Sequence, residues 1–170
     1  MATAKRAQRR AAPGKTPRKA AKSARKKPVR AYEIVSDDES IDRGEGHLTP
    51  MDKMNMSKEG VTKKDFEAIK ERLRLDYDSM ATILSVTRAT LLNKKGDEKF
   101  NTPLSERIID VNDIYSYGIE VFEDEDRLQE WIHRPNRALG GKTPIDIMDS
   151  QFGREEVRNL IGRIAYGVYS

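Results

Sequence analysis

The sequence of 170 residues contains no cysteine and only two histidines, His47 and His133. Disulfides, thiolate metal sites and cysteine nucleophiles are therefore excluded, and we expect a cytoplasmic protein without metal or cofactor. No run of about 18 apolar residues exists, so we expect no membrane contact. The N-terminus also lacks the apolar core of a secretory signal. Hydrophobic residues make up only 36% of the chain and charged residues 35%, which predicts that part of it is disordered.

Acidic residues are absent from positions 1–30, which carry twelve lysines and arginines. The remaining residues hold 20 basic and 28 acidic side chains, a net charge of −8. The composition predicts a disordered basic arm over 1–30, whose natural partner is a polyanion because phosphate contacts release condensed counterions. A solubilising tail and an organelle transit peptide are the alternatives. Residues 31–56 are rich in acidic residues, and we expect them to form an acidic linker that could fold back on the arm.

Helix signals run from residue 57 to the end without an alternating strand pattern, so we expect an all-α fold. Thr62 and Asp65 form a capping-box pattern ahead of a first helix. Asp78 is expected to cap a second, short helix. Thr87 is expected to cap a third, which Gly96 ends.

Two further groups of helices are expected. A long helix opens at Thr102-Pro103 and is apolar on two sides, so one side should face its own domain and the other a partner or the C-terminal module. We therefore predict a domain over 57–122 and a second one over 123–170. The signals expected in the second domain are an N-cap, a helix stop, a turn, another N-cap with proline, and a C-cap: Asp124, Pro135, Gly140-Gly141, Thr143-Pro144 and Gly153.

Catalytic patterns are missing from the chain. The segment Gly140 to Thr143 reads GGKT, but a phosphate loop needs glycine at position 136, where Asn136 stands, and a strand before it. The two histidines lack companions at metal-ligand spacing, and no serine has a nearby histidine to form a triad. A compact helical module without such groups is expected to act by contact, so we predict that the protein is not an enzyme.

Two short helices joined at Ser85-Val86 predict a helix-turn-helix, a motif whose second helix faces base edges. Arg88 could make a bidentate contact with guanine, worth about 1–3 kcal/mol of discrimination. The alternative is a helical hairpin used only for packing, because residues 57–120 hold 11 basic and 12 acidic side chains and the turn has no glycine. The candidate DNA-binding residues are Thr87, Arg88, Thr90, Asn93, Lys94 and Lys95.

The last 45 residues carry a specific set of motifs: Trp131, Pro135-Asn136, Ala138 to Gly141, Thr143-Pro144, Gly153 and Tyr166-Gly167. With these motifs, residues 60–170 resemble the Xre/MbcA/ParS antitoxins of bacterial type II toxin–antitoxin systems. Residues 1–56 lie outside the resemblance.

The resemblance implies an antitoxin with two roles. Its C-terminal domain would bind a RES-domain toxin, an ADP-ribosyltransferase-like protein that uses NAD, and its C-terminal end would block the toxin's NAD pocket. A Cro-like helix-turn-helix domain would dimerise within a toxin–antitoxin hetero-oligomer and repress its own operon by binding operator DNA, which would place the protein at the nucleoid when bound.

The motif residues divide by their physical chemistry. Seven are expected to be structural, as core anchor, turns and caps: Trp131, Pro135, Leu139, Gly140, Gly141, Thr143 and Pro144. Arginine and tyrosine dominate interface energetics, although an ordinary amphipathic helix with a frayed end is the alternative. The candidate toxin-binding residues are Arg158, Arg163, Tyr166, Gly167, Tyr169 and Ser170.

Two other classes of protein remain open from the sequence. One is a DNA-binding transcriptional or nucleoid-associated regulator without a toxin partner. The other is an organellar or scaffold protein whose leader is cleaved. A toxin reading frame beside the gene favours the antitoxin, and its absence favours the regulator.

Overall fold

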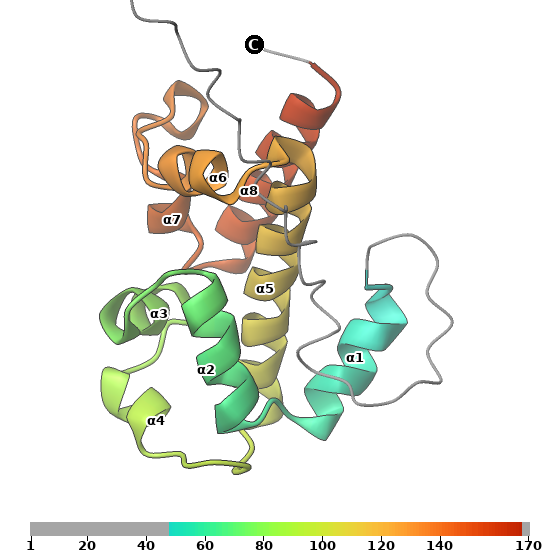
Figure 1. The fold of residues 1–170 in the computed structure, drawn as a ribbon, viewed down its shortest axis with the longest axis vertical. Helices are drawn as coiled ribbons and strands as arrows, with labels where there is room; N and C mark the ends of the chain where they lie inside the picture. Colours follow the sequence, from blue (N-terminus) through green and yellow to red (C-terminus); the bar gives the residue numbers. More distant parts are fainter. Residues whose placement is uncertain (1–47, 168–170) are drawn as a thin grey trace, which may run out of the picture.

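The computed structural model describes residues 48–167 and is all-α, as predicted (Figure 1). Within these residues only an isolated bridge between Thr62 and Lys99 has extended pairing. In the same range, none of the helices has the length and apolar character needed to cross a membrane. The elements in chain order are α1 (Pro50–Glu59), α2 (Lys63–Arg72), α3 (Tyr77–Ile83), α4 (Arg88–Leu92), α5 (Thr102–Phe122), α6 (Glu125–Ile132), a 3₁₀ turn (Arg137–Leu139), α7 (Pro144–Ile147) and α8 (Gln151–Ala165).

Helix α5 is the long central element, and the other helices are arranged along it (Figure 1). Helix α2 lies beside its N-terminal half, with α3 and α4 farther from it, and α6 and α8 lie beside its C-terminal half. The prediction that two sides of this helix are covered is confirmed. Helix α1 packs on it, and so do α8 and α6 of the C-terminal domain. The N-cap is Asn101, whose side chain accepts from the Leu104 N–H, and the predicted cap Thr102 is the first helical residue. The sequence prediction was therefore wrong by one position.

The helix-turn-helix region is built on capped short helices. Thr62 and Asp65 form the predicted capping box at the start of α2, and Thr87 caps α4 as predicted. The cap of α3 is Asp76, which accepts from the Ser79 N–H at 2.7 Å, so the prediction of Asp78 was wrong. Their inward side chains form one core, which includes Phe66, Ile69, Leu73, Met80, Leu84 and Leu91.

Helix α1 begins inside the segment predicted to be an acidic linker. Thr49 and Asp52 form a capping box, and Pro50 occupies the first helical position. Met56 is buried in the core, whereas Met51 and Met54 are exposed. The linker prediction is thus wrong for residues 50–56; its part up to residue 47 and the basic arm lie outside the described residues.

The C-terminal domain has most of the predicted local signals. Asp124 caps α6, and Thr143 caps α7 with Pro144 at its start. Gly140 and Gly141 have φ of 66° and 85°, which glycine adopts readily, so this segment is a turn as predicted. Trp131 is half-buried against Phe122, with ring centroids 5.4 Å apart.

Gly153 is not the helix C-cap that the sequence predicted. It lies in the first turn of α8, where its N–H donates to the Ser150 side chain at 3.0 Å. The residue is buried, and a β-carbon built on it would lie 1.6 Å from the Ile147 carbonyl oxygen. Glycine is needed here for the close approach of two backbone segments.

Candidate functional surfaces

The first surface is the exposed side of α4. Of its five residues only Leu91 is buried, and the N-cap is Thr87, whose side chain accepts from the Thr90 N–H. Arg88 is exposed and forms an ion pair with Asp78 of α3 at 2.9 Å, with side chains 55% and 67% exposed. Such an open pair contributes little to stability. The Arg88 guanidinium is therefore available to bind another acceptor in place of Asp78.

The structure brings the predicted DNA-binding residues together on one short stretch of chain. They include the N-cap of α4, residues of the helix and residues of the loop that follows it, and all are exposed except Lys94, which is half-buried. They are Thr87, Arg88, Thr90, Asn93, Lys94 and Lys95.

A buried lysine that the sequence reasoning missed fixes the far end of α4. The Lys63 ammonium donates to the carbonyl of Leu91 at 2.8 Å and to the Tyr77 hydroxyl at 2.8 Å, and it pairs with Glu67 at 2.7 Å. It also lies over the rings of Tyr77 and Phe66, 4.6 and 5.1 Å from their centroids. A cation at a helix C-terminus satisfies a free carbonyl and the helix dipole together. Only the three-dimensional fold reveals this role, because Lys63 is 28 residues from Leu91.

The groups around this lysine show the expected shifts of pKa. Burial disfavours ionisation of Glu67, but the bonds from Lys63 and Tyr77 outweigh it and hold the pKa of Glu67 below its usual value. The pKa of Tyr77 is raised by burial and by the Glu67 carboxylate. The Ser79 N–H lowers the pKa of Asp76, the cap of α3. These shifts favour the ionised carboxylates of Glu67 on α2 and Asp76 at the start of α3, and the neutral hydroxyl of Tyr77.

The second surface is the outer side of α8 and its end. Tyr166 is 85% exposed and follows the last residue of the helix. Gly167 is exposed with φ of 67°, and Tyr169 and Ser170 lie outside the described residues. Arg163 is partly exposed and pairs with Glu156 on the same helix at 2.5 Å.

Arg158 has an internal position that the sequence prediction did not anticipate. Its guanidinium donates to Asp113 at 2.6 Å and to Asp110 at 2.9 Å, both on α5. Asp113 is nearly fully buried, so this pair belongs to the packing of α8 on α5. Asp110 and Asp113, three residues apart among the apolar residues in the middle of α5, were the signal for such partners, because buried acids require cations.

Phe152 is an exposed aromatic side chain that the sequence reasoning did not select. It is 82% exposed and lies in the first turn of α8. Phe152 and Tyr166 are 14 residues apart, which corresponds to about 21 Å along a helix and to about the same face. An aromatic side chain therefore stands at each end of one outward face of α8.

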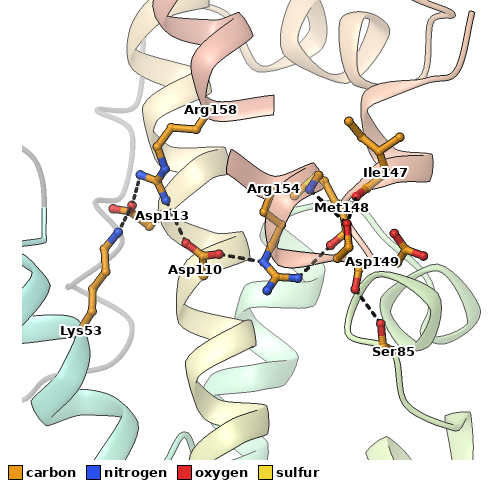
Figure 2. Close-up of polar contacts among 11 residues, drawn as sticks. Lys53, Ser85, Asp110, Asp113, Ile147, Met148, Asp149, Arg154 and Arg158 are labelled. Carbon is orange, nitrogen blue, oxygen red and sulfur yellow. Dashed lines mark hydrogen bonds and ion pairs between the residues drawn. The ribbon is translucent and has the colours of Figure 1, made fainter. Parts of the chain in front are cut away.

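A polar network joins α1, α5 and α8 between the two surfaces (Figure 2). Lys53 of α1 pairs with Asp113 at 2.5 Å, and Asp113 also accepts from Arg158. Asp110 accepts from Arg158 and, at 2.7 Å, from the Nε of Arg154, which is buried. The same Arg154 donates to the carbonyl of Met148 at 3.0 Å, at the corner between α7 and α8. The network therefore fixes the positions of α1 and α8 on α5.

No cluster of metal-binding side chains occurs in residues 48–167. The polar groups of both surfaces are arranged as ion pairs and caps, and what they offer a partner is donors, charges and aromatic rings. The fold and its two surfaces define an all-helical protein with a helix-turn-helix domain followed by a small helical domain.

Comparison with known proteins identifies both domains. The family described as antitoxin Xre-like helix-turn-helix domain matches residues 55–111. The family described as antitoxin Xre/MbcA/ParS C-terminal toxin-binding domain matches residues 118–167. Residues 55–111 and 118–167 therefore match the two antitoxin domain families in tandem, and the resemblance found in the sequence is confirmed.

Three individual proteins are similar to parts of this chain. An Antitoxin Xre from Photorhabdus laumondii is 37% identical over 76 residues, covering 44% of this chain and 51% of the relative. A Prs ADP-ribosylating antitoxin from Sphingobium sp. is 28% identical over 133 residues, covering 72% and 83%. The crystal structure of the M. tuberculosis MbcT–MbcA toxin–antitoxin complex has a chain that matches with a TM-score of 0.47 and 21% identity, covering 62% of this chain and 94% of that one. This chain spans about half the length of the Photorhabdus relative.

Proposed function

We propose that the protein is a non-enzymatic antitoxin that neutralises a cognate toxin of the RES type and represses its own operon by binding promoter DNA. The observation that carries the proposal is the tandem order of the two matched domains over residues 55–167. The name of the Sphingobium relative links that protein to ADP-ribosylation, a reaction that uses NAD, which supports an NAD-using toxin as the partner here. The protein would act in the cytoplasm as a homodimer within a hetero-oligomer.

The toxin contact is proposed on the outward face of α8 and at its end. Phe152 and Tyr166 are exposed there, and large aromatic side chains are frequent anchors of interfaces. Arg163 remains in the proposed contact because its pair with Glu156 is half-exposed. Arg158 is left out because its guanidinium is occupied by Asp110 and Asp113. The segment from Tyr166 to the C-terminus would enter the toxin's NAD pocket.

Co-purification tests the proposal directly. The tagged protein is co-expressed with the product of the adjacent reading frame, and the purified complex is weighed by native mass spectrometry. We expect a stable hetero-oligomer in which the partner's NAD consumption is suppressed and returns when the antitoxin is removed. A partner that consumes NAD equally well in the complex contradicts the blocking of its active site.

The alternative function is a DNA-binding regulator without a toxin partner. The observation that favours it is the exposed side of α4, where Thr87, Arg88 and Thr90 are exposed to solvent. Specific promoter binding together with failure to capture the neighbouring product would support this alternative.

Arg88→Ala is expected to lower the preference for the promoter over random DNA about tenfold, because a bidentate contact with a base is worth about 1–3 kcal/mol. Binding is measured by fluorescence anisotropy on a promoter duplex and a scrambled duplex at fixed salt.

Removal of residues 1–30 should instead weaken binding to both duplexes and reduce the salt dependence of binding.

The control for Arg88→Ala is Asp78→Ala. It breaks the same ion pair, whose Arg88 Nη1 lies 2.9 Å from Asp78, but it keeps the guanidinium. We expect this variant to retain the preference for the promoter. Equal losses on both duplexes for Arg88→Ala would contradict a base-reading role.

A further inference from the structure

The turn between α3 and α4 contains a strained residue. Ser85 has φ of 52°, a left-handed conformation that favours glycine and is uncommon for other residues. A helix-turn-helix turn often contains glycine at such a point. A serine in this conformation persists only where its surroundings stabilise it.

A hydrogen bond from the other domain stabilises the turn. The Ser85 hydroxyl donates to the carbonyl of Asp149 at 2.7 Å, across 64 residues of sequence. Asp149 lies at the corner between α7 and α8, and Figure 2 shows this bond reaching from the corner to the turn. The side chain of residue 85, and not only its backbone, therefore matters for the position of the turn.

The corner is itself held rigidly. The buried Arg154 donates to the carbonyl of Met148, one residue before Asp149, and it is fixed in turn by Asp110 of α5. On the other side of the turn, Arg107 of α5 donates to the Leu84 carbonyl at 2.8 Å. Both residues next to the junction are thus bonded to arginines that α5 supports.

Apolar packing supports the same junction. Ile83, the last residue of α3, faces a small apolar cavity of about 10 Å³ together with Ile145 and Met148 of the C-terminal domain. All three belong to the hydrophobic core or pack against it. The C-terminal end of α3 therefore packs against α7, directly before the turn at Ser85.

Helix α4 depends on this support for its orientation. It has five residues, and a helix of this length is not stable alone, so its position is set by its contacts. Lys63 holds its C-terminal end through Leu91. The N-terminal end, where Arg88 stands, follows the turn at Ser85.

We infer that Ser85 is a positioning residue for DNA recognition, and that the α7–α8 corner of the toxin-binding domain sets the orientation of α4. The inference rests on the proposed DNA binding and makes the C-terminal domain part of the DNA-reading unit. Promoter affinity then depends on the Ser85–Asp149 contact, through the orientation of α4.

The test compares Ser85→Gly with Glu123→Gly in the full-length protein. Both positions have a left-handed backbone, with φ of 52° and 53°, so both variants relieve the same strain. Only Ser85→Gly removes a hydrogen bond between the domains. Glu123 is an exposed C-cap residue of α5 and serves as the matched control.

Two measurements are made on each variant: hydrogen exchange of residues 84–93, and affinity for the promoter and for a scrambled duplex. For Ser85→Gly we expect faster exchange in this segment and a promoter affinity about fivefold lower, as for the loss of one hydrogen bond, with scrambled DNA unaffected. Glu123→Gly should change neither. A variant that only lowers the overall stability would affect binding to the promoter and to the scrambled duplex alike.

Unchanged exchange in Ser85→Gly overturns the inference, and so does faster exchange with wild-type promoter affinity. If the wild-type protein prefers no promoter sequence, the proposed DNA binding fails. The exchange measurement still decides in that case whether the corner anchors the turn. The two failures are thus distinguishable.

Discussion

Replacement of Gly153 by alanine is expected to destabilise the protein by about 4 kcal/mol or more, a large part of the total for a domain of this size. The added methyl group would lie 1.6 Å from the Ile147 carbonyl oxygen and 2.6 Å from its carbonyl carbon. Both atoms are backbone, so relief requires the α7–α8 corner to move. That movement would break the bond from Arg154 to the Met148 carbonyl. Urea unfolding followed by circular dichroism measures the effect.

Gly162→Ala on the same helix is the matched control. Its β-carbon would meet only the Tyr117 hydroxyl oxygen, at 3.4 Å, an ordinary contact. Alanine is favoured over glycine inside a helix by about 1 kcal/mol, so this variant should be as stable as the wild type or more so. Equal stability of the Gly153→Ala and Gly162→Ala variants would contradict the close packing of the corner.

Arg154→Met is expected to cost about 3 kcal/mol. Methionine fills part of the space, but the Met148 carbonyl loses its donor, and Asp110 keeps only Arg158 as a partner. Removing one partner from a buried ion pair leaves the other without full compensation, and the penalty exceeds that of an exposed pair. The free energy of unfolding in urea is the measurement.

Arg163→Met provides the comparison for this variant. Arg163 also lies on α8 and pairs with one acid, Glu156, but the two side chains are 38% and 40% exposed. An exposed pair is worth about 0–1 kcal/mol, so the change in stability should be small. A similar cost for both variants would show that burial of the Arg154 network does not contribute.

The sequence predicted the helical fold well because its signals are local. The caps Thr62, Thr87, Asp124 and Thr143 each act within three residues, so the order of residues is enough to locate them. The apolar face of α5 likewise follows from spacing alone.

The wrong caps arose where two candidate residues were close together. Asp76 immediately precedes α3 and Asp78 lies in its first turn, and the true start places Tyr77 against Lys63 of α2. Asn101 and Thr102 are adjacent, and the preceding Phe100 is buried against Phe66 with centroids 5.5 Å apart. Tertiary packing helped to decide between neighbouring residues that can each act as an N-cap.

The candidate surfaces were only partly predictable. The exposure of α4 followed from its place in the motif, whereas the internal role of Arg158 depends on acids 45 and 48 residues away. Lys63 and Ser85 also have distant partners, Leu91 and Asp149, which are 28 and 64 residues away in sequence. A single sequence carries no signal for such pairs beyond the general need of buried charges for partners.

The measurement closest to the central claim is growth protection by a chain that ends at Ala165. The core residues of α8 are Val157, Leu160 and Ile161, and they remain in this variant, so its unfolding midpoint should match that of the full-length protein. On co-expression with the toxin, the full-length protein should restore growth and the shortened one should not, because Tyr166 and the residues after it are removed. Full protection by the shortened and folded chain would contradict the proposal that the C-terminal end blocks the toxin.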